Sequence, residues 1–139
     1  MKRAVTLVFA LFADGCGSSI DPPASEFPAE PYATMISETG ELSIEVRTSP
    51  AQPLDRGVAR ALFTITRGSG VPIDGLQIEV TPWMPAMAHG TSLRPIVSAE
   101  GNGRYVIDNL GLFMPGQWQL KTSFAGAVED RVTPTIEVR

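Results

Sequence analysis

The residues best suited to chemistry lie in one short segment, Trp83 to His89, which reads Trp-Met-Pro-Ala-Met-Ala-His. This segment contains the only His of the chain, two of its five Met and one of its two Trp. Met thioethers are soft ligands that select Cu(I), and copper also accepts an imidazole, whereas Zn(II) and Mg(II) gain little from a thioether. Met84, Met87 and His89 therefore form a residue set typical of a copper site.

Other interpretations of the same segment, in which it binds no metal, remain open. Met is a flexible gap-filler of apolar cores, so Met84 and Met87 could simply plug the end of a β-sandwich. His89 could be an exposed loop residue ahead of a Gly-Thr-Ser turn. An exposed Trp-Met-Met patch would in turn suit the docking of another protein.

The elements that must position this segment are β-strands. Apolar and polar residues alternate repeatedly from residue 40 onward, and no stretch of comparable length follows a helical period. The predicted strands cover residues 42–47, 59–66, 76–81, 96–99, 103–109, 117–124 and 132–138. With 13 Gly and 12 Pro supplying the turns between them, the pattern predicts an all-β fold, an immunoglobulin-like two-sheet antiparallel sandwich of about seven strands.

Sandwich topology adds a fourth candidate ligand. In this architecture the third and sixth predicted strands, residues 76–81 and 117–124, are antiparallel neighbours. The end of the third strand then lies beside the start of the sixth, which brings Met114 to the same edge as Met84 and Met87. We also expect Trp83 to cap such a site, because an indole face attracts a cation.

The first residues predict export. Met1-Lys2-Arg3 is a short positive start, and Ala4 to Ala13 is an apolar run that would span only about 15 Å as a helix. This run is typical of a signal peptide, which we place at residues 1–15. The Cys that follows it resembles the lipobox of bacterial lipoproteins, in which Cys16 would be lipidated and become the first mature residue. An ordinary secretory signal, cut near Gly15 or Ser19, is the alternative.

Composition bounds what lies between the signal and the sandwich. Residues 16–39 carry four Pro among Ser, Ala and Glu, which predicts a flexible tether ahead of a domain at residues 40–139.

A net charge of −4 argues against nucleic acid as a partner. No nucleophile elbow and no phosphate-binding loop accompany His89, so we do not expect an enzyme.

Three short motifs of the predicted sandwich resemble those of a known family. Met-Pro-x-Met-x-His, Gly-x-Gly-x-Tyr and Met-Pro-Gly-x-Trp occur here in that order as residues 84–89, 101–105 and 114–118. These motifs are similar to those of the YtkA-like domain family, which is related to FixH-type proteins. The resemblance covers about residues 40–139 and implies a small exported or membrane-anchored β-sandwich of bacteria, associated with copper handling and cytochrome oxidase assembly.

Residues and resemblance together give one functional expectation. We expect a lipid-anchored module of the bacterial cell envelope that binds Cu(I) through Met84, Met87, His89 and Met114. Its partners would be the membrane, reached through the anchor, and a copper donor or acceptor protein of the envelope. The alternative is a non-catalytic interaction or structural module that docks a partner through its sheet edge or its Trp/Met loop.

Overall fold

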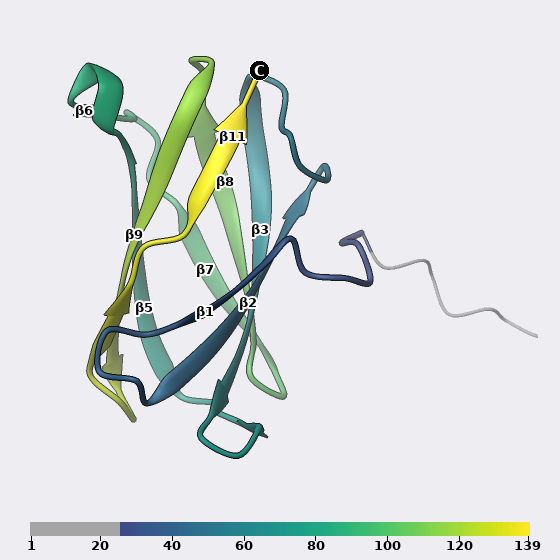
Figure 1. Cartoon of the computed structure of the whole chain (residues 1–139), viewed down its shortest axis with the longest axis vertical. Helices are drawn as coiled ribbons and strands as arrows, with labels where there is room; N and C mark the ends of the chain where they lie inside the picture. The colour runs from purple at the N-terminus through teal and green to yellow at the C-terminus, as the bar shows by residue number, and fades with distance from the viewer. Residues whose placement is uncertain (1–25) are drawn as a thin grey trace, which may run out of the picture.

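Alternation of apolar and polar residues in the sequence becomes, in the computed structural model, two antiparallel sheets stacked face to face (Figure 1). The structure describes residues 26–139. One sheet has the order β1-β2-β3-β8-β7, with β4 also paired to β3. Its strands are β1 (Ala33–Ile36), β2 (Leu42–Ser49), β3 (Gly57–Arg67), β4 (Val71–Pro72), β7 (Ile96–Gly101) and β8 (Arg104–Leu112).

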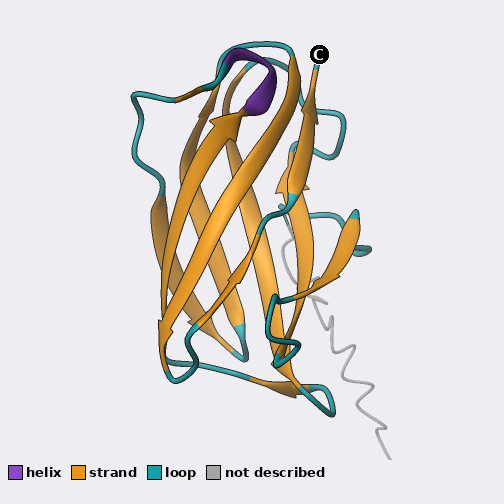
Figure 2. Cartoon of the chain, turned by 60° about the vertical axis from the view of Figure 1, so that its left-hand side comes forward, coloured by secondary structure: helices purple, strands orange, loops and turns teal. Residues whose placement is uncertain are grey.

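The second sheet has the order β10-β9-β5-β6, with β11 also paired to β9. Its strands are β5 (Leu76–Met84), β6 (His89–Gly90), β9 (Gly116–Gly126), β10 (Asp130–Val132) and β11 (Thr135–Val138). A single turn of 3₁₀-helix, η1 (Pro85–Met87), joins β5 to β6 and is drawn in purple in Figure 2. No helix within residues 26–139 is long and apolar enough to cross a membrane.

The sandwich predicted from the sequence is confirmed. All seven predicted strands are present, and the predicted neighbours pair as β5 and β9, with Trp83 opposite Gln119. The inward positions of β2, occupied by Leu42, Ile44 and Val46, are at most 1% exposed, as alternation requires. The structure adds β1, the two short strands β4 and β6, and a break that divides the last predicted strand into β10 and β11.

The segment expected as a tether contributes to the fold in its described part. β1 pairs with β2 along its whole length, from Ala33 opposite Val46 to Ile36 opposite Ser43. Phe27 is buried against the outward side chains of Leu62 and Val106 in a small second core. Residues 26–36 thus contribute to the folded domain in two ways: Phe27 buries apolar surface on the outer face of the first sheet, and β1 extends that sheet at its edge.

Polar contacts fasten this segment, which we call the strap (residues 26–32). Arg47 donates through Nε to the carbonyl oxygen of Pro28 (3.1 Å) and through Nη2 to that of Ala29 (3.0 Å). Arg60 pairs with Glu26 and lies over the Phe27 ring, with Cζ 5.8 Å from the ring centroid. The predicted signal peptide, the lipidation site Cys16 and the rest of the predicted tether lie outside the described residues.

The strap predicts a local response to truncation of its anchor. Phe27→Ala removes the ring that covers Leu62 and Val106, and we expect the free energy of unfolding to fall by about 1–3 kcal/mol. The strap itself should become sensitive to proteases while the sandwich stays folded, because the main core does not include Phe27. Urea unfolding and limited proteolysis measure the two effects. Ile36→Ala, at a side chain 62% exposed, is the control, and an equal loss there would contradict this account.

A buried carboxylate joins the start of the first sheet to the second sheet. Asp130 accepts hydrogen bonds from the Thr39 hydroxyl, the Thr39 N–H (3.1 Å) and the Arg131 N–H (2.8 Å). Burial alone would raise the pKa of Asp130, but these bonds, with one from the Ser37 hydroxyl, outweigh it and lower the pKa to about 2. The ionised form is thus the one that the fold stabilises.

Acid should therefore weaken the fold in a defined window. The folded pKa of Asp130, about 2, lies below its ordinary value of 3.8, so its contribution is complete above about pH 4 and is lost as the pH falls toward 2. Asp130→Asn should cost about 1–3 kcal/mol at pH 7 and flatten the stability profile between pH 4 and 2. Urea denaturation across this range measures both. Asp55→Asn, at an exposed carboxylate paired with Arg139, should change neither.

Candidate functional site

Two turns meet at one end of the sandwich and carry the predicted ligands. Strand β5 ends at Met84 and continues through η1 to β6, where His89 pairs back onto Met84. Pairing of β5 with β9 brings the turn before β9 to the same end. Figures 1 and 2 both show η1 and β6 beside the beginning of β9.

The sequence explains why the chain turns after Met84. Pro85 opens the 3₁₀ turn, where its missing N–H leaves no helical hydrogen bond unmade. Ala88 closes the turn in the left-handed region (φ 51°), and its N–H donates to the carbonyl oxygen of Pro85 (3.2 Å). The chain thereby reverses within four residues and returns His89 to the end of β5.

The imidazole of His89 is half-buried, and both a hydrogen bond and an aromatic contact fix its position. Its Nδ1 lies 2.9 Å from the carbonyl oxygen of Gly90, and its ring meets the Trp118 ring edge-on, with centroids 6.2 Å apart. A carbonyl oxygen only accepts hydrogen bonds, so Nδ1 of the neutral ring must carry the proton. Nε2 then keeps its lone pair, which is the state in which a protein histidine binds a metal.

Trp118 also fixes the position of the turn that carries Met114, beside His89. The indole N–H of Trp118 donates to the carbonyl oxygen of Met114 (2.9 Å), which fixes the turn that enters β9. A cavity of about 180 Å³ opens between this turn and His89. Its lining residues are His89, Gly90, Thr91, Ser92, Gly111, Phe113, Met114 and Trp118.

Neither of the other two predicted ligands is among the residues that line this cavity. Met84 is 3% exposed and belongs to the main core; its Cε lies 2.7 Å from where a Cβ on Gly116 would stand. Met87 is 54% exposed on the outside of η1. The structure therefore brings His89 and Met114 together in one cavity, buries Met84 in the main core and leaves Met87 on the surface turn.

Trp83 does not cap the site, contrary to expectation. It is adjacent to Met84 in β5, and successive side chains of a strand point to opposite faces. Its ring therefore lies on the outer face, where Nζ of Lys121 stands 4.5 Å from the ring centroid. The indole at the site is that of Trp118, which the sequence analysis did not assign to the site, although it follows Met114 by only four residues.

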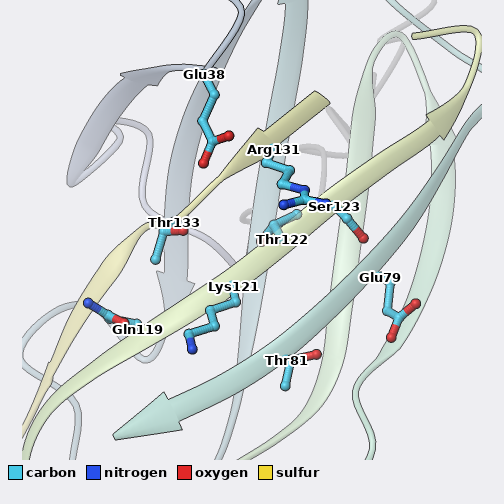
Figure 3. Close-up of a pocket in the computed structure, with 9 residues that line it drawn as sticks. All are labelled: Glu38, Glu79, Thr81, Gln119, Lys121, Thr122, Ser123, Arg131 and Thr133. Atoms are coloured by element: carbon cyan, nitrogen blue, oxygen red, sulfur yellow. The ribbon is translucent and has the colours of Figure 1, made fainter. Parts of the chain in front are cut away.

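A second hollow, on the outer face of the second sheet, has a different chemistry (Figure 3). Its lining is polar and of mixed charge, and includes no thioether and no imidazole. The lining residues are Glu38, Glu79, Thr81, Gln119, Lys121, Thr122, Ser123, Arg131 and Thr133. Within residues 26–139, no three His, Cys, Asp or Glu side chains gather where they could hold a metal ion. Of the four Met within residues 26–139, three (Met84, Met87 and Met114) belong to the turns at the His89 end, and Met35 lies in β1.

The fold and the candidate site indicate a class of protein, a small antiparallel β-sandwich with Met and His residues where two turns meet. The family model described as YtkA-like matches residues 38–123. This match covers more than half of the chain, and the protein belongs to the YtkA-like family. No curated protein and no solved structure matches the chain significantly.

The geometry of His89 predicts a measurable tautomer. In the absence of metal, the neutral ring should carry its proton on Nδ1, because the Gly90 carbonyl oxygen can only accept. A long-range ¹H–¹⁵N spectrum of the ring reports which nitrogen is protonated, and assignment is direct because the chain has one His. A proton found on Nε2 would contradict the hydrogen bond to Gly90.

Proposed function

We propose that this protein is an exported, lipid-anchored module of the cell envelope that binds Cu(I) for copper handling. The observation that carries the proposal is that His89 and Met114 line the same small cavity. The hydrogen bond from Nδ1 of His89 to Gly90 supports it, because that bond leaves Nε2 available as a ligand. A nitrogen and a thioether sulfur form a donor pair suited to Cu(I).

The remaining thioethers support a low-coordinate site with an open side. Met87, exposed on η1, carries a flexible side chain that can close over a bound ion from the solvent side. Met84 approaches from the core and is the most constrained of the four candidates. In this arrangement His89, Met114 and Met87 are the ligands we favour, and Met84 is the candidate whose packing role competes with ligation.

The proposed reaction is ligand exchange rather than redox turnover. An ion held between the cavity and an exposed turn can be reached by a ligand of a second protein without unfolding of the sandwich. Cys16, as the lipidated residue, would hold the module at a membrane surface. A donor or acceptor protein of the envelope would then meet the site at the end of the sandwich that carries η1.

A competition titration with Cu(I) and a chromophoric chelator, under reducing conditions, tests the proposal. The full chain should carry Cys16→Ser, so that its thiol does not compete for the ion. We expect one equivalent to bind tighter than about 1 μM. His89→Gln and Met114→Leu should each weaken binding at least about tenfold, which is about 1.4 kcal/mol.

Two further variants complete this experiment. Met35→Leu, the same change at a partly buried Met of β1, is the matched control and should leave affinity unchanged. The double variant Met84→Leu/Met87→Leu should bind Cu(I) far more weakly while remaining folded. Unchanged affinity in both this double variant and Met114→Leu would overturn the copper proposal.

The docking alternative has an observation of its own. Phe113 and Met87, at the turns that flank the cavity, are 51% and 54% exposed. Large apolar side chains exposed at one end of a domain favour contact with a protein partner. A chain that bound no Cu(I) in the titration, but lost a co-purifying envelope protein on Phe113→Ser, would support docking in place of metal binding.

A further inference from the structure

One wall of the His89 cavity is a loop, residues 91–95, that has little hydrogen bonding of its own. Thr91 and Ser92 line the cavity directly. In the described part of the chain, no backbone–backbone hydrogen bond ties residues 91–95 to another segment. Within the loop, the Leu93 N–H donates to the Thr91 hydroxyl at a long 3.4 Å. Something outside the loop must therefore hold this wall in place.

Strand β8 supplies that hold through Asn109. The side-chain amide nitrogen of Asn109 donates to the carbonyl oxygen of Arg94 (2.9 Å). Two residues further on, Gly111 lies directly under the loop: a Cβ there would stand 2.8 Å from the Thr91 hydroxyl oxygen and 2.9 Å from Cδ1 of Leu93. The loop thus rests on the bare backbone of Gly111 and is fastened at Asn109.

The backbone of Asn109 is unusual for a residue inside a strand. Its φ is +63°, in the left-handed region that L side chains other than Asn and Asp seldom adopt. The register between β3 and β8 shifts at the same place, where Ala59 pairs with Leu110 but Ala61 pairs with Ile107. A bulge of this kind bends a strand and redirects one side chain. Here the redirected side chain is the one that reaches Arg94.

We propose that Asn109 is a positioning residue of the metal site, and this inference rests on the proposed copper function. Its bulge aims the side-chain amide at the loop, and the amide holds the wall formed by Thr91 and Ser92 against His89 and Met114. The strained conformation lies next to the site, which is where backbone strain is generally retained. The side-chain hydrogen bond of Asn109 goes to Arg94, so in this proposal Asn109 acts through the loop.

Asn109→Gly separates the hydrogen bond from the backbone, because Gly adopts φ +63° without strain but has no amide to donate. Asn102→Gly is the matched control: Asn102 is also left-handed (φ 53°), and it lies in the β7–β8 turn at the other end of β8. Both variants carry Cys16→Ser. Asn109→Asp serves as a second test variant, since Asp tolerates the left-handed region but presents a carboxylate to the Arg94 carbonyl.

The first readouts need no metal. In Asn109→Gly, ¹⁵N relaxation should show order parameters of Ser92 to Arg94 falling from about 0.85 toward 0.6, and the ring signals of His89 should shift. The thermal midpoint should match that of Asn102→Gly. In the second step, Cu(I) affinity should fall about tenfold relative to the control. Asn109→Asp should reproduce both effects.

The outcomes distinguish this inference from the copper proposal. Unchanged loop dynamics and His89 signals in Asn109→Gly would overturn the role of Asn109, whatever the affinity. A loosened loop with unchanged Cu(I) affinity would overturn positioning of the metal site while leaving the site itself intact. Absence of Cu(I) binding by the parent chain would overturn the copper function and, with it, the metal role of Asn109.

Discussion

The indole of Trp118 is the group on which both the core and the candidate site depend. A buried indole N–H needs a hydrogen-bond acceptor, because an unpaired buried donor destabilises the folded state. It finds one in the carbonyl oxygen of Met114, so burying the ring also fixes the turn that leads into β9. The ring is 2% exposed between the sheets, and its edge meets His89. The same side chain, Trp118, therefore packs the core of the sandwich and positions the candidate site.

The candidate sulfur and nitrogen ligands around Trp118 differ in how far they are exposed to solvent. Met84 is locked in the core, Met114 and His89 are half-buried, and Met87 is exposed on a short turn. A group fixed by packing loses little freedom when it binds an ion, whereas a mobile one must be ordered but also releases readily. A graded set of this kind suits an ion that has to be held and then passed on. A fully buried set would favour storage instead.

Sequence periodicity was enough to predict the sandwich and the pairing of β5 with β9, because both follow from alternation and chain order. The same alternation, applied to the adjacent Trp83 and Met84, would have put them on opposite faces and removed Trp83 from the site. The loop at residues 91–95 has no period, so nothing in the sequence predicted that Asn109 would hold it.

The strap was missed although the sequence carried a signal for it. Ala61-Leu62-Phe63 in β3 and Tyr105-Val106-Ile107 in β8 are apolar triplets, and a strand with one wet face should not have them. Such triplets mean that both faces of the sheet are covered at that point. The cover is Phe27, a single residue in a Pro-rich stretch whose composition favours a tether. Composition describes the segment as a whole and does not reveal that the Phe27 side chain docks on the sheet.

Docking of the strap changes how far an N-terminal anchor lets the domain move. A tether ending at residue 39 would place 23 residues between Cys16 and the domain, whereas a chain fastened from Glu26 onward leaves nine, residues 17–25. Nine residues span at most about 32 Å when fully extended. The strap lies on the first sheet, away from the end that carries η1 and β6 in both views (Figures 1 and 2). An anchor at Cys16 would thus hold the domain near the membrane by one face and leave the His89 end free to meet a partner.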